Sequence, residues 1–173
     1  MAYGTDAAFT AYATARGVTL PDHQSSRDQL RAKATTFVDG LGWKVVAGVP
    51  VNRFPGKPTS ATQLDAWPRT GATDTYGNEI ASGSVPTAIE NAAYEAAIFE
   101  NASAGALNQS VRDDQRVVRE KFDVIEFQYA DSGAVGSSGQ IASSVPVIPS
   151  VMTLLAPYLS GGSNGLGITA VVA

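Results

Sequence analysis

Few side chains in this sequence could do catalytic chemistry. His23 is the single histidine, and the chain contains no cysteine. A serine–histidine–aspartate arrangement would need His23 as its base, but no nucleophile elbow accompanies it, so we interpret His23 as a surface or capping residue. The lack of cysteine excludes disulfides, thiol catalysis and cysteine-ligated zinc. The sequence therefore predicts no active site, and we expect the protein not to be an enzyme.

Two glycine-containing segments approach nucleotide-binding motifs but fail on spacing. The phosphate-loop pattern requires a further glycine at position 51, ahead of Gly56 and Lys57, and the chain has Val51 there. The segment GLGITA at 165–170 matches a dinucleotide-binding fingerprint by its letters alone, because the chain ends at Ala173 and leaves no room for the required helix. We expect no cofactor.

The acidic residues do not have the spacing of metal ligands. Asp74, Asn78 and Glu79 supply oxygen atoms in a turn-rich segment, but DTYGNE does not place them at EF-hand positions. The glutamates at 90, 95 and 100 are interpreted as a solvated helix face. We expect no metal ion.

Basic side chains in the first half of the chain could contact nucleic acid. They are spread along the sequence rather than clustered, and solvated helix faces are the simpler explanation. An acidic chain that meets DNA transiently, without strong phosphate contacts, would suit a conduit through which DNA passes. The residues concerned are Arg27, Arg31, Lys33, Lys44, Arg53, Lys57 and Arg69.

The charge changes sign along the chain, whose net charge is −4. Residues 1–70 carry eight Lys and Arg against five Asp and Glu, and residues 71–131 carry four against eleven. Residues 132–173 carry no charged side chain, which indicates linker, buried surface or both. The longest apolar run is too short for a membrane span, and the N-terminus does not look like a signal peptide. We expect a soluble protein that is made inside a cell and does not enter a membrane.

Hydrophobic periodicity predicts a small helical bundle, so the fold class is mainly α. Thr5 is the expected N-cap of the first helix, and Ser26 with Gln29 forms an expected capping box for the second, which should end at Gly40. Pro86 suits the first turn of the third helix. The four expected helices cover residues 5–17, 25–40, 86–103 and 149–161.

Between the second and third helices, residues 43–86 are rich in proline and glycine and predict a long irregular loop, with a short extended piece in GWKVVAGVPV. Large apolar side chains are expected to anchor this loop on the helices. Among them, Trp67 is interpreted as a core pin, with Arg69 beside it to pair with a carboxylate or a neighbouring subunit. The expected anchors are Trp43, Phe54, Leu64, Trp67 and Ile80.

Period-two alternation near Ile125 predicts a β-hairpin. We divide the chain into a helical domain over 1–131, with the hairpin at 115–131, a flexible linker at 132–144, and a C-terminal helix with an extended docking arm at 145–173. Tyr94 and Ile98 are expected on the outward side of the third helix. The expected anchor and interface residues are Trp67, Arg69, Tyr94, Ile98, Leu155, Leu159, Leu166 and Ile168.

The segment QLDAWPRTGATDTYGNEI, which starts at Gln63, and the following VPTAIENAAYEAA resemble a family of tailed-phage proteins. FVDGLGWK, REKFDVIEFQYAD and MTLLAPYLSGG fit the same family in order, so the resemblance covers residues 6–162. Such sequences are often labelled DnaT-like single-stranded-DNA-binding proteins, and they are also similar to head–tail connectors, or adaptors. The longer Ser/Gly linker and the uncharged tail depart from the family pattern.

The resemblance implies a non-catalytic structural protein of the virion, located in the neck between head and tail. It implies a ring of commonly twelve copies, a dodecamer, that binds the portal on one side and a downstream neck or tail-completion protein on the other. Packaged DNA would make transient, non-specific contact with such a ring, and the subunit would be made in the host cytoplasm. The alternative is a replication protein that binds single-stranded DNA, which predicts stacking aromatics beside a basic groove.

Overall fold

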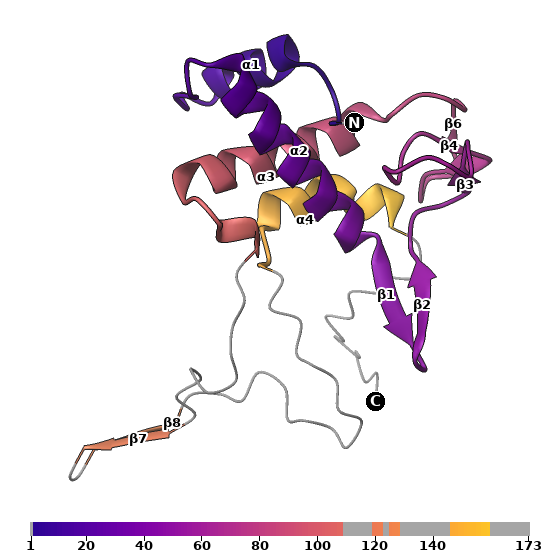
Figure 1. The fold of residues 1–173 in the computed structure, drawn as a ribbon. Helices are drawn as coiled ribbons and strands as arrows, with labels where there is room; N and C mark the ends of the chain where they lie inside the picture. The colour runs from indigo at the N-terminus through magenta and orange to yellow at the C-terminus, as the bar shows by residue number, and fades with distance from the viewer. Residues whose placement is uncertain (1, 109–118, 123–124, 129–145, 160–173) are drawn as a thin grey trace, which may run out of the picture.

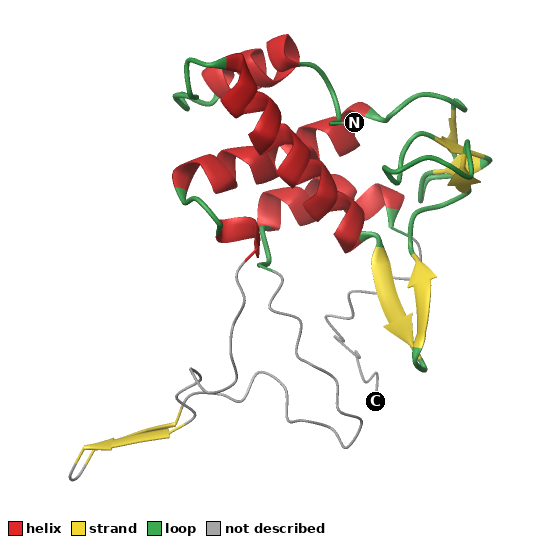
Figure 2. Cartoon of the chain, viewed as in Figure 1, coloured by secondary structure: helices red, strands yellow, loops and turns green. Residues whose placement is uncertain are grey.

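The computed structural model describes residues 2–108, 119–122, 125–128 and 146–159. Within these ranges the fold is mainly α with small antiparallel strand pairs, as predicted (Figures 1 and 2). Helix α2 crosses α3, and α4 lies along α3. The helices are α1 (Asp6–Ala15), α2 (Gln24–Leu41), α3 (Thr87–Ala102) and α4 (Pro149–Leu155), with 3₁₀ turns η1 (Ala106–Asn108) and η3 (Ala156–Tyr158).

The two N-terminal helices begin in different ways. Thr5 caps α1 as predicted, because its Oγ1 accepts a hydrogen bond from the backbone N–H of Ala8 at 3.2 Å. The predicted capping box of α2 is wrong: the helix begins at Gln24, with His23 at the N-cap position, and both proposed capping residues lie inside it. His23 makes no side-chain capping bond, and its carbonyl accepts from the backbone N–H groups of residues 26 and 27.

The start of α2 is held by Arg27 instead of a capping side chain. The Arg27 guanidinium donates to both carboxylate oxygens of Asp6, each at 2.8 Å, and to the carbonyl oxygens of Pro21 and Asp22. These bonds tie the connection between α1 and α2 to both helices. A local capping signal could not reveal them, because Arg27 and Asp6 are separated by 21 residues.

The core is built where α3 meets its neighbours. Ala92, Ala93, Ala96 and Ala97 on α3 are at most 1% exposed. Small side chains at these positions let the helices approach closely. Ile89 is buried on the same face of α3, whereas Phe99 near its end is 39% exposed.

The N-terminal segment is also part of the core. Tyr3 is 3% exposed, and its backbone N–H donates to Thr35 Oγ1 at 3.0 Å. Arg31 donates to the carbonyl of Gly4 at 2.8 Å. Gly4 has a φ of +65°, and a β-carbon at this position would collide with the hydroxyl of Tyr94. Glycine is therefore required where the chain passes over α3.

The region 43–86 contains more regular structure than expected from its sequence. It holds three short antiparallel pairs, β1–β2, β3–β4 and β5–β6, where the sequence predicts an irregular loop with one short extended piece. The longest pair turns through Ala47 and Gly48, whose φ angles of +51° and +81° are typical of a tight two-residue hairpin turn. The strands are β1 (Trp43–Val46), β2 (Val49–Asn52), β3 (Lys57–Pro58), β4 (Arg69–Thr70), β5 (Ala72–Thr73) and β6 (Glu79–Ile80).

The hairpin predicted within 115–131 is confirmed. Strands β7 (Arg119–Phe122) and β8 (Ile125–Gln128) pair antiparallel, and the last pair in the register is Phe122 opposite Ile125. The predicted linker at 132–144 and the end of the C-terminal arm lie outside the described residues.

Helix α4 shares one core with the N-terminal helices. Val151 and Leu155 are fully buried, and Leu159 after η3 is 6% exposed. They lie in the same apolar cluster as Phe9 of α1 and Ile89 of α3. The C-terminal helix expected within 145–173 is therefore packed into the bundle.

Candidate functional site

Trp67 is the largest fully buried side chain among the described residues, with 1% of its surface exposed. Its ring packs edge-on against Phe54 from the same loop, with centroids 5.8 Å apart, and against Tyr158 after α4, at 6.2 Å. The Trp67–Pro68 peptide bond is cis. The structure thus confirms the prediction that Trp67 pins the loop to the core.

A hydrogen-bonded cluster around Asp39 connects this loop to α2 and to the N-terminal segment. The Tyr3 hydroxyl donates to Asp39 Oδ1 and accepts from the backbone N–H of Trp67 at 3.0 Å. Asp39 Oδ2 accepts from the backbone N–H of Ala66 at 2.9 Å. Burial raises the pKa of Asp39, although the bonds from Tyr3 and Ala66 act to lower it. Burial also raises the pKa of Tyr3. The cluster fixes three distant segments at one point.

Arg69 binds backbone carbonyls rather than the carboxylate or subunit that we expected. It is 2% exposed, and its Nε donates to the carbonyl of Pro55 at 2.6 Å. Its two terminal nitrogens donate to the carbonyls of Gly56 at 2.8 Å and Ala66 at 3.1 Å. Burial lowers the pKa of Arg69, and the charge of nearby Asp39 acts in the opposite direction. Backbone carbonyl oxygens can satisfy the N–H donors of Arg69 because the folded loop directs several of them toward its planar guanidinium.

Two of the five expected loop anchors are exposed. Phe54 and Trp67 are buried, and Ile80 packs against the core. Trp43 is 54% exposed and Leu64 is 94% exposed, so the prediction that they anchor the loop is wrong. A large apolar residue in a loop does not by itself indicate burial, because its direction depends on the fold around it.

The other expected interface residues lie mostly inside the molecule. Tyr94 is 2% exposed, because the N-terminal segment covers it, so its expected outward position is wrong. Ile98 is half-buried and packs against the core. Leu155 and Leu159 are core residues, and they are not available as surface contacts. The expected tail contacts Leu166 and Ile168 lie outside the described residues.

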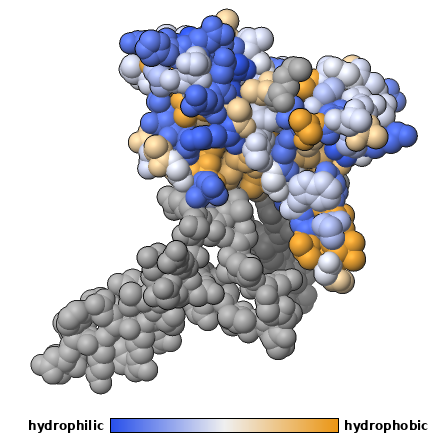
Figure 3. Space-filling view, viewed as in Figure 1, coloured by the Kyte–Doolittle hydropathy of each residue, from blue (hydrophilic) through white to orange (hydrophobic). Residues whose placement is uncertain are grey.

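A group of exposed apolar residues lies on the β1–β2 hairpin, and the sequence did not predict this exposure. Its strands carry five large apolar side chains that are 39–59% exposed. In Figure 3 this hairpin forms an orange surface at the lower right, below the body of the molecule. Contiguous exposed apolar side chains mark interaction surfaces. The residues, here called the apolar ribbon, are Trp43, Val45, Val46, Val49 and Val51.

Several basic side chains that could contact nucleic acid are already paired with acids. Arg27 pairs with Asp6, and Lys33 pairs with Glu100 at 2.8 Å. Further pairs join Arg16 to Glu95 and Arg31 to Asp28. Together with the buried Arg69, these contacts occupy five of the eight Lys and Arg side chains in residues 2–108. A phosphate would have to compete with these internal contacts.

Glu100 is a buried acid rather than part of the solvated face that its spacing suggested. It is 3% exposed and accepts hydrogen bonds from Lys33 Nζ and from the backbone N–H groups of Gly105 and Leu107. Burial acts to raise the pKa of Glu100, but these bonds outweigh it, and the pKa is lowered from its ordinary value. Glu100 thereby fixes the chain after α3.

We expect Glu100→Gln to lower the free energy of unfolding at pH 7 by about 1–3 kcal/mol, because three bonds to a carboxylate are weakened. Because the pKa of Glu100 is lower in the folded state, its carboxylate stabilises the fold fully at pH values above the ordinary pKa of a glutamate. This stabilisation is lost as the pH falls through the pKa of Glu100 in the folded state. Urea unfolding of both proteins across this range should show their difference shrinking toward low pH. A difference that is constant with pH would contradict an electrostatic role.

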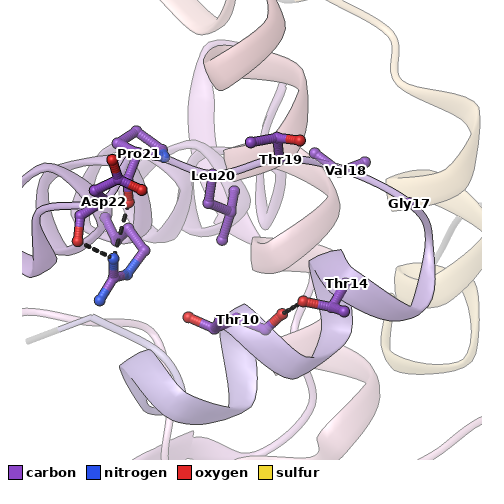
Figure 4. Close-up of a pocket in the computed structure, with 9 residues that line it drawn as sticks. Thr10, Thr14, Gly17, Val18, Thr19, Leu20, Pro21 and Asp22 are labelled. Carbon is purple, nitrogen blue, oxygen red and sulfur yellow. Dashed lines mark hydrogen bonds between the residues drawn. The ribbon is translucent and has the colours of Figure 1, made fainter.

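A hollow of about 500 Å³ lies between the end of α1 and the start of α2 (Figure 4). Thr10, Thr14 and Leu20 line it, and Thr14 donates to the carbonyl of Thr10. Arg27 borders it but donates to Pro21 and Asp22, as the dashed lines show. We assign no ligand to it, since its one basic side chain is already bonded to the protein.

In the part of the chain that the structure describes, no three acidic or histidine side chains gather into a metal-binding group. Within the same residues, no helix combines the length and hydropathy that a membrane span requires. His23 has no side-chain capping bond at the start of α2.

These features define a mainly α-helical protein with a pinned loop and an exposed apolar ribbon. The sequence model of the family described as "Putative DnaT-like ssDNA binding protein" matches residues 2–172, so the chain belongs to this family. The family description indicates contact with DNA, and it supports the expected alternative, single-stranded-DNA binding, better than the connector. No curated protein and no solved structure matches the chain.

Proposed function

We propose that this chain is a non-catalytic structural subunit of a phage head–tail connector ring. The observation that carries the proposal is the apolar ribbon, whose five large side chains are exposed in the single chain. Exposure of this kind favours a protein that assembles with other protein surfaces. The phage-protein resemblance of residues 6–162 supports the same assignment.

The distribution of charge agrees with passage of DNA rather than a firm grip on it. The chain is acidic, with a net charge of −4, and several of its basic groups are held by internal acids. Strong phosphate contacts would slow DNA that moves through a ring. In this proposal the portal and a downstream neck protein are the partners, the ring has commonly twelve copies, and the site is the neck of the virion.

Immunogold electron microscopy of purified particles, with antiserum against this protein, tests the connector. We expect gold at the junction of head and tail, and particles that lack the protein provide the control. A protein that is abundant in infected cells but missing from particles would contradict the connector and favour a role in replication.

The second candidate is single-stranded-DNA binding, which the family description supports. One feature of the surface also favours it. Residues 40–64 carry Lys44, Arg53 and Lys57 and no acidic residue, and they include the half-exposed ring of Trp43. An exposed aromatic ring in a segment whose charges are all basic is a feature of sites on which bases stack.

Tryptophan fluorescence separates the two candidates, because Trp43 is exposed and Trp67 is buried. For a connector we expect oligo(dT) at physiological salt to leave the emission unchanged. Salt-sensitive quenching that Trp43→Ala abolishes would contradict this expectation and identify a stacking site. Fluorescence anisotropy of a labelled oligonucleotide, measured in parallel, shows whether DNA binds at a site away from the Trp43 side chain.

A further inference from the structure

The apolar ribbon is apolar on both of its faces. Opposed residues of an antiparallel pair lie on the same face, and alternate residues on opposite faces. Val45 lies opposite Pro50, and Trp43 shares their face. Val46 lies opposite Val49 on the other face, which also carries Lys44.

Neither face of this ribbon is covered by the described residues of the same chain. The burial pattern is exposed at six of the eight strand positions, with only the residues at 44 and 52 half-buried. A two-stranded hairpin alone in water is marginal, and it gains stability when its apolar faces are packed. The ribbon is therefore suited to insertion between surfaces rather than to free exposure.

The charges of the segment that contains the ribbon indicate which kind of surface it would bind. Residues 40–64, which contain it, carry three basic side chains and no acidic one. Described residues 71–108 carry five acidic side chains and no basic one. Two of the five, Glu95 and Glu100, pair with Arg16 and Lys33 inside the chain.

The remaining three acids lie on β5–β6 and at the start of α3. Glu79 is exposed, while Asp74 and Glu90 are half-exposed. Asp74 accepts from the backbone N–H groups of Tyr76 and Asn78, which fixes its carboxylate at the surface. The β5–β6 pairing brings Asp74 and Glu79 close together, and these two acids define the acidic surface, which is opposite in sign to residues 40–64.

We infer that the apolar ribbon of one copy docks on the acidic surface of the next copy of this chain. The inference rests on the proposed connector and names its subunit contact. In the proposed connector this contact is head-to-tail, and its repetition forms a ring where the rotation between neighbouring copies closes.

Photo-cross-linking in assembled particles tests this contact. The full chain carries p-benzoylphenylalanine in place of Val46 on the ribbon, and a matched chain carries it in place of Thr10, which is exposed on α1. We expect irradiation of the ribbon-labelled particles to give a band with the mass of two chains. Mass spectrometry should place the adduct within residues 71–102 of the second copy, and the Thr10 chain should give none.

The outcomes separate failure of this contact from failure of the connector. Adducts with another virion protein or with DNA, or no adduct at all from particles that contain the chain, would overturn the ribbon contact and leave the connector standing. Absence of the chain from particles would overturn both. The distinction is made by the antiserum, which reports incorporation independently of cross-linking.

A charge exchange gives a second readout that does not depend on the cross-linker position. We expect Lys44→Glu alone and Glu79→Lys alone each to weaken the two-chain band obtained with a lysine-independent photo-cross-linker. Together in one chain they should restore it, because the opposite signs are exchanged. Melting temperatures of all three proteins must match the unaltered chain. Failure of the double variant to recover, with folding intact, would overturn the charge complementarity.

Discussion

Replacing Trp67 with alanine should lower the free energy of unfolding by about 3–5 kcal/mol. The indole is 1% exposed and contacts Phe54 from its own loop and Tyr158 beyond α4. Its removal would leave a cavity between the loop and the segment after α4. The cost of this cavity adds to the transfer free energy that is lost with the buried side chain. Urea unfolding followed by circular dichroism measures the change.

The second tryptophan provides a matched control. Trp43→Ala removes the same side chain from a position that is 54% exposed, and we expect a change within about 0.5 kcal/mol. Trp67→Phe should cost less than Trp67→Ala, because the indole Nε1 is buried without a hydrogen-bond partner in the described residues and its loss breaks no bond. Equal effects of the two alanine replacements would show that Trp67 does not pin the loop.

The helices could be predicted because their signals are local. The stripe that contains Ile89, Ala92 and Ala96 on α3 repeats at three- and four-residue spacing, and all three are fully buried. The side chain of Thr5 caps the backbone N–H of the residue three positions later. Neither inference requires knowledge of which segments meet in the fold.

Tyr94 and Arg69 could not be placed by the same reasoning. Tyr94 lies opposite the apolar stripe of α3, but the N-terminal segment passes over it, and its hydroxyl accepts from the Thr5 N–H. The residues in this contact are 89 positions apart. Arg69 suggests a carboxylate partner by its charge, whereas the loop offers carbonyl groups that only the folded chain brings together. Both errors come from long-range contacts.

The apolar ribbon was partly visible in the sequence. GWKVVAGVPV indicated a short extended segment, but the Ala47–Gly48 turn is a weaker hairpin signal than Asn-Gly or Asp-Gly. Trp43 was interpreted as a buried anchor because large aromatic rings are usually buried. Its exposure follows from the hairpin leaving the end of α2, which carries both faces away from the helices (Figure 1).

Replacing Arg69 with alanine should lower the free energy of unfolding by roughly 3–5 kcal/mol, because each buried carbonyl left without a donor costs about 1–3 kcal/mol. The guanidinium holds the carbonyls of Pro55, Gly56 and Ala66, so one side chain closes the loop across the ends of β3 and β4. Arg69→Lys should recover part of the loss, since an ammonium keeps the charge but cannot reproduce the planar fork.

Lys57→Ala is the matched control for this prediction, because Lys57 is a cation on the paired strand β3, opposite Thr70, and is exposed. We expect it to change the free energy of unfolding by no more than about 0.5 kcal/mol. Hydrogen exchange adds a local readout: Arg69→Ala should speed exchange in the loop over 53–70 more than in α3. Uniform acceleration throughout the bundle would mean that Arg69 supports the whole core, whereas no acceleration would contradict its role in closing the loop.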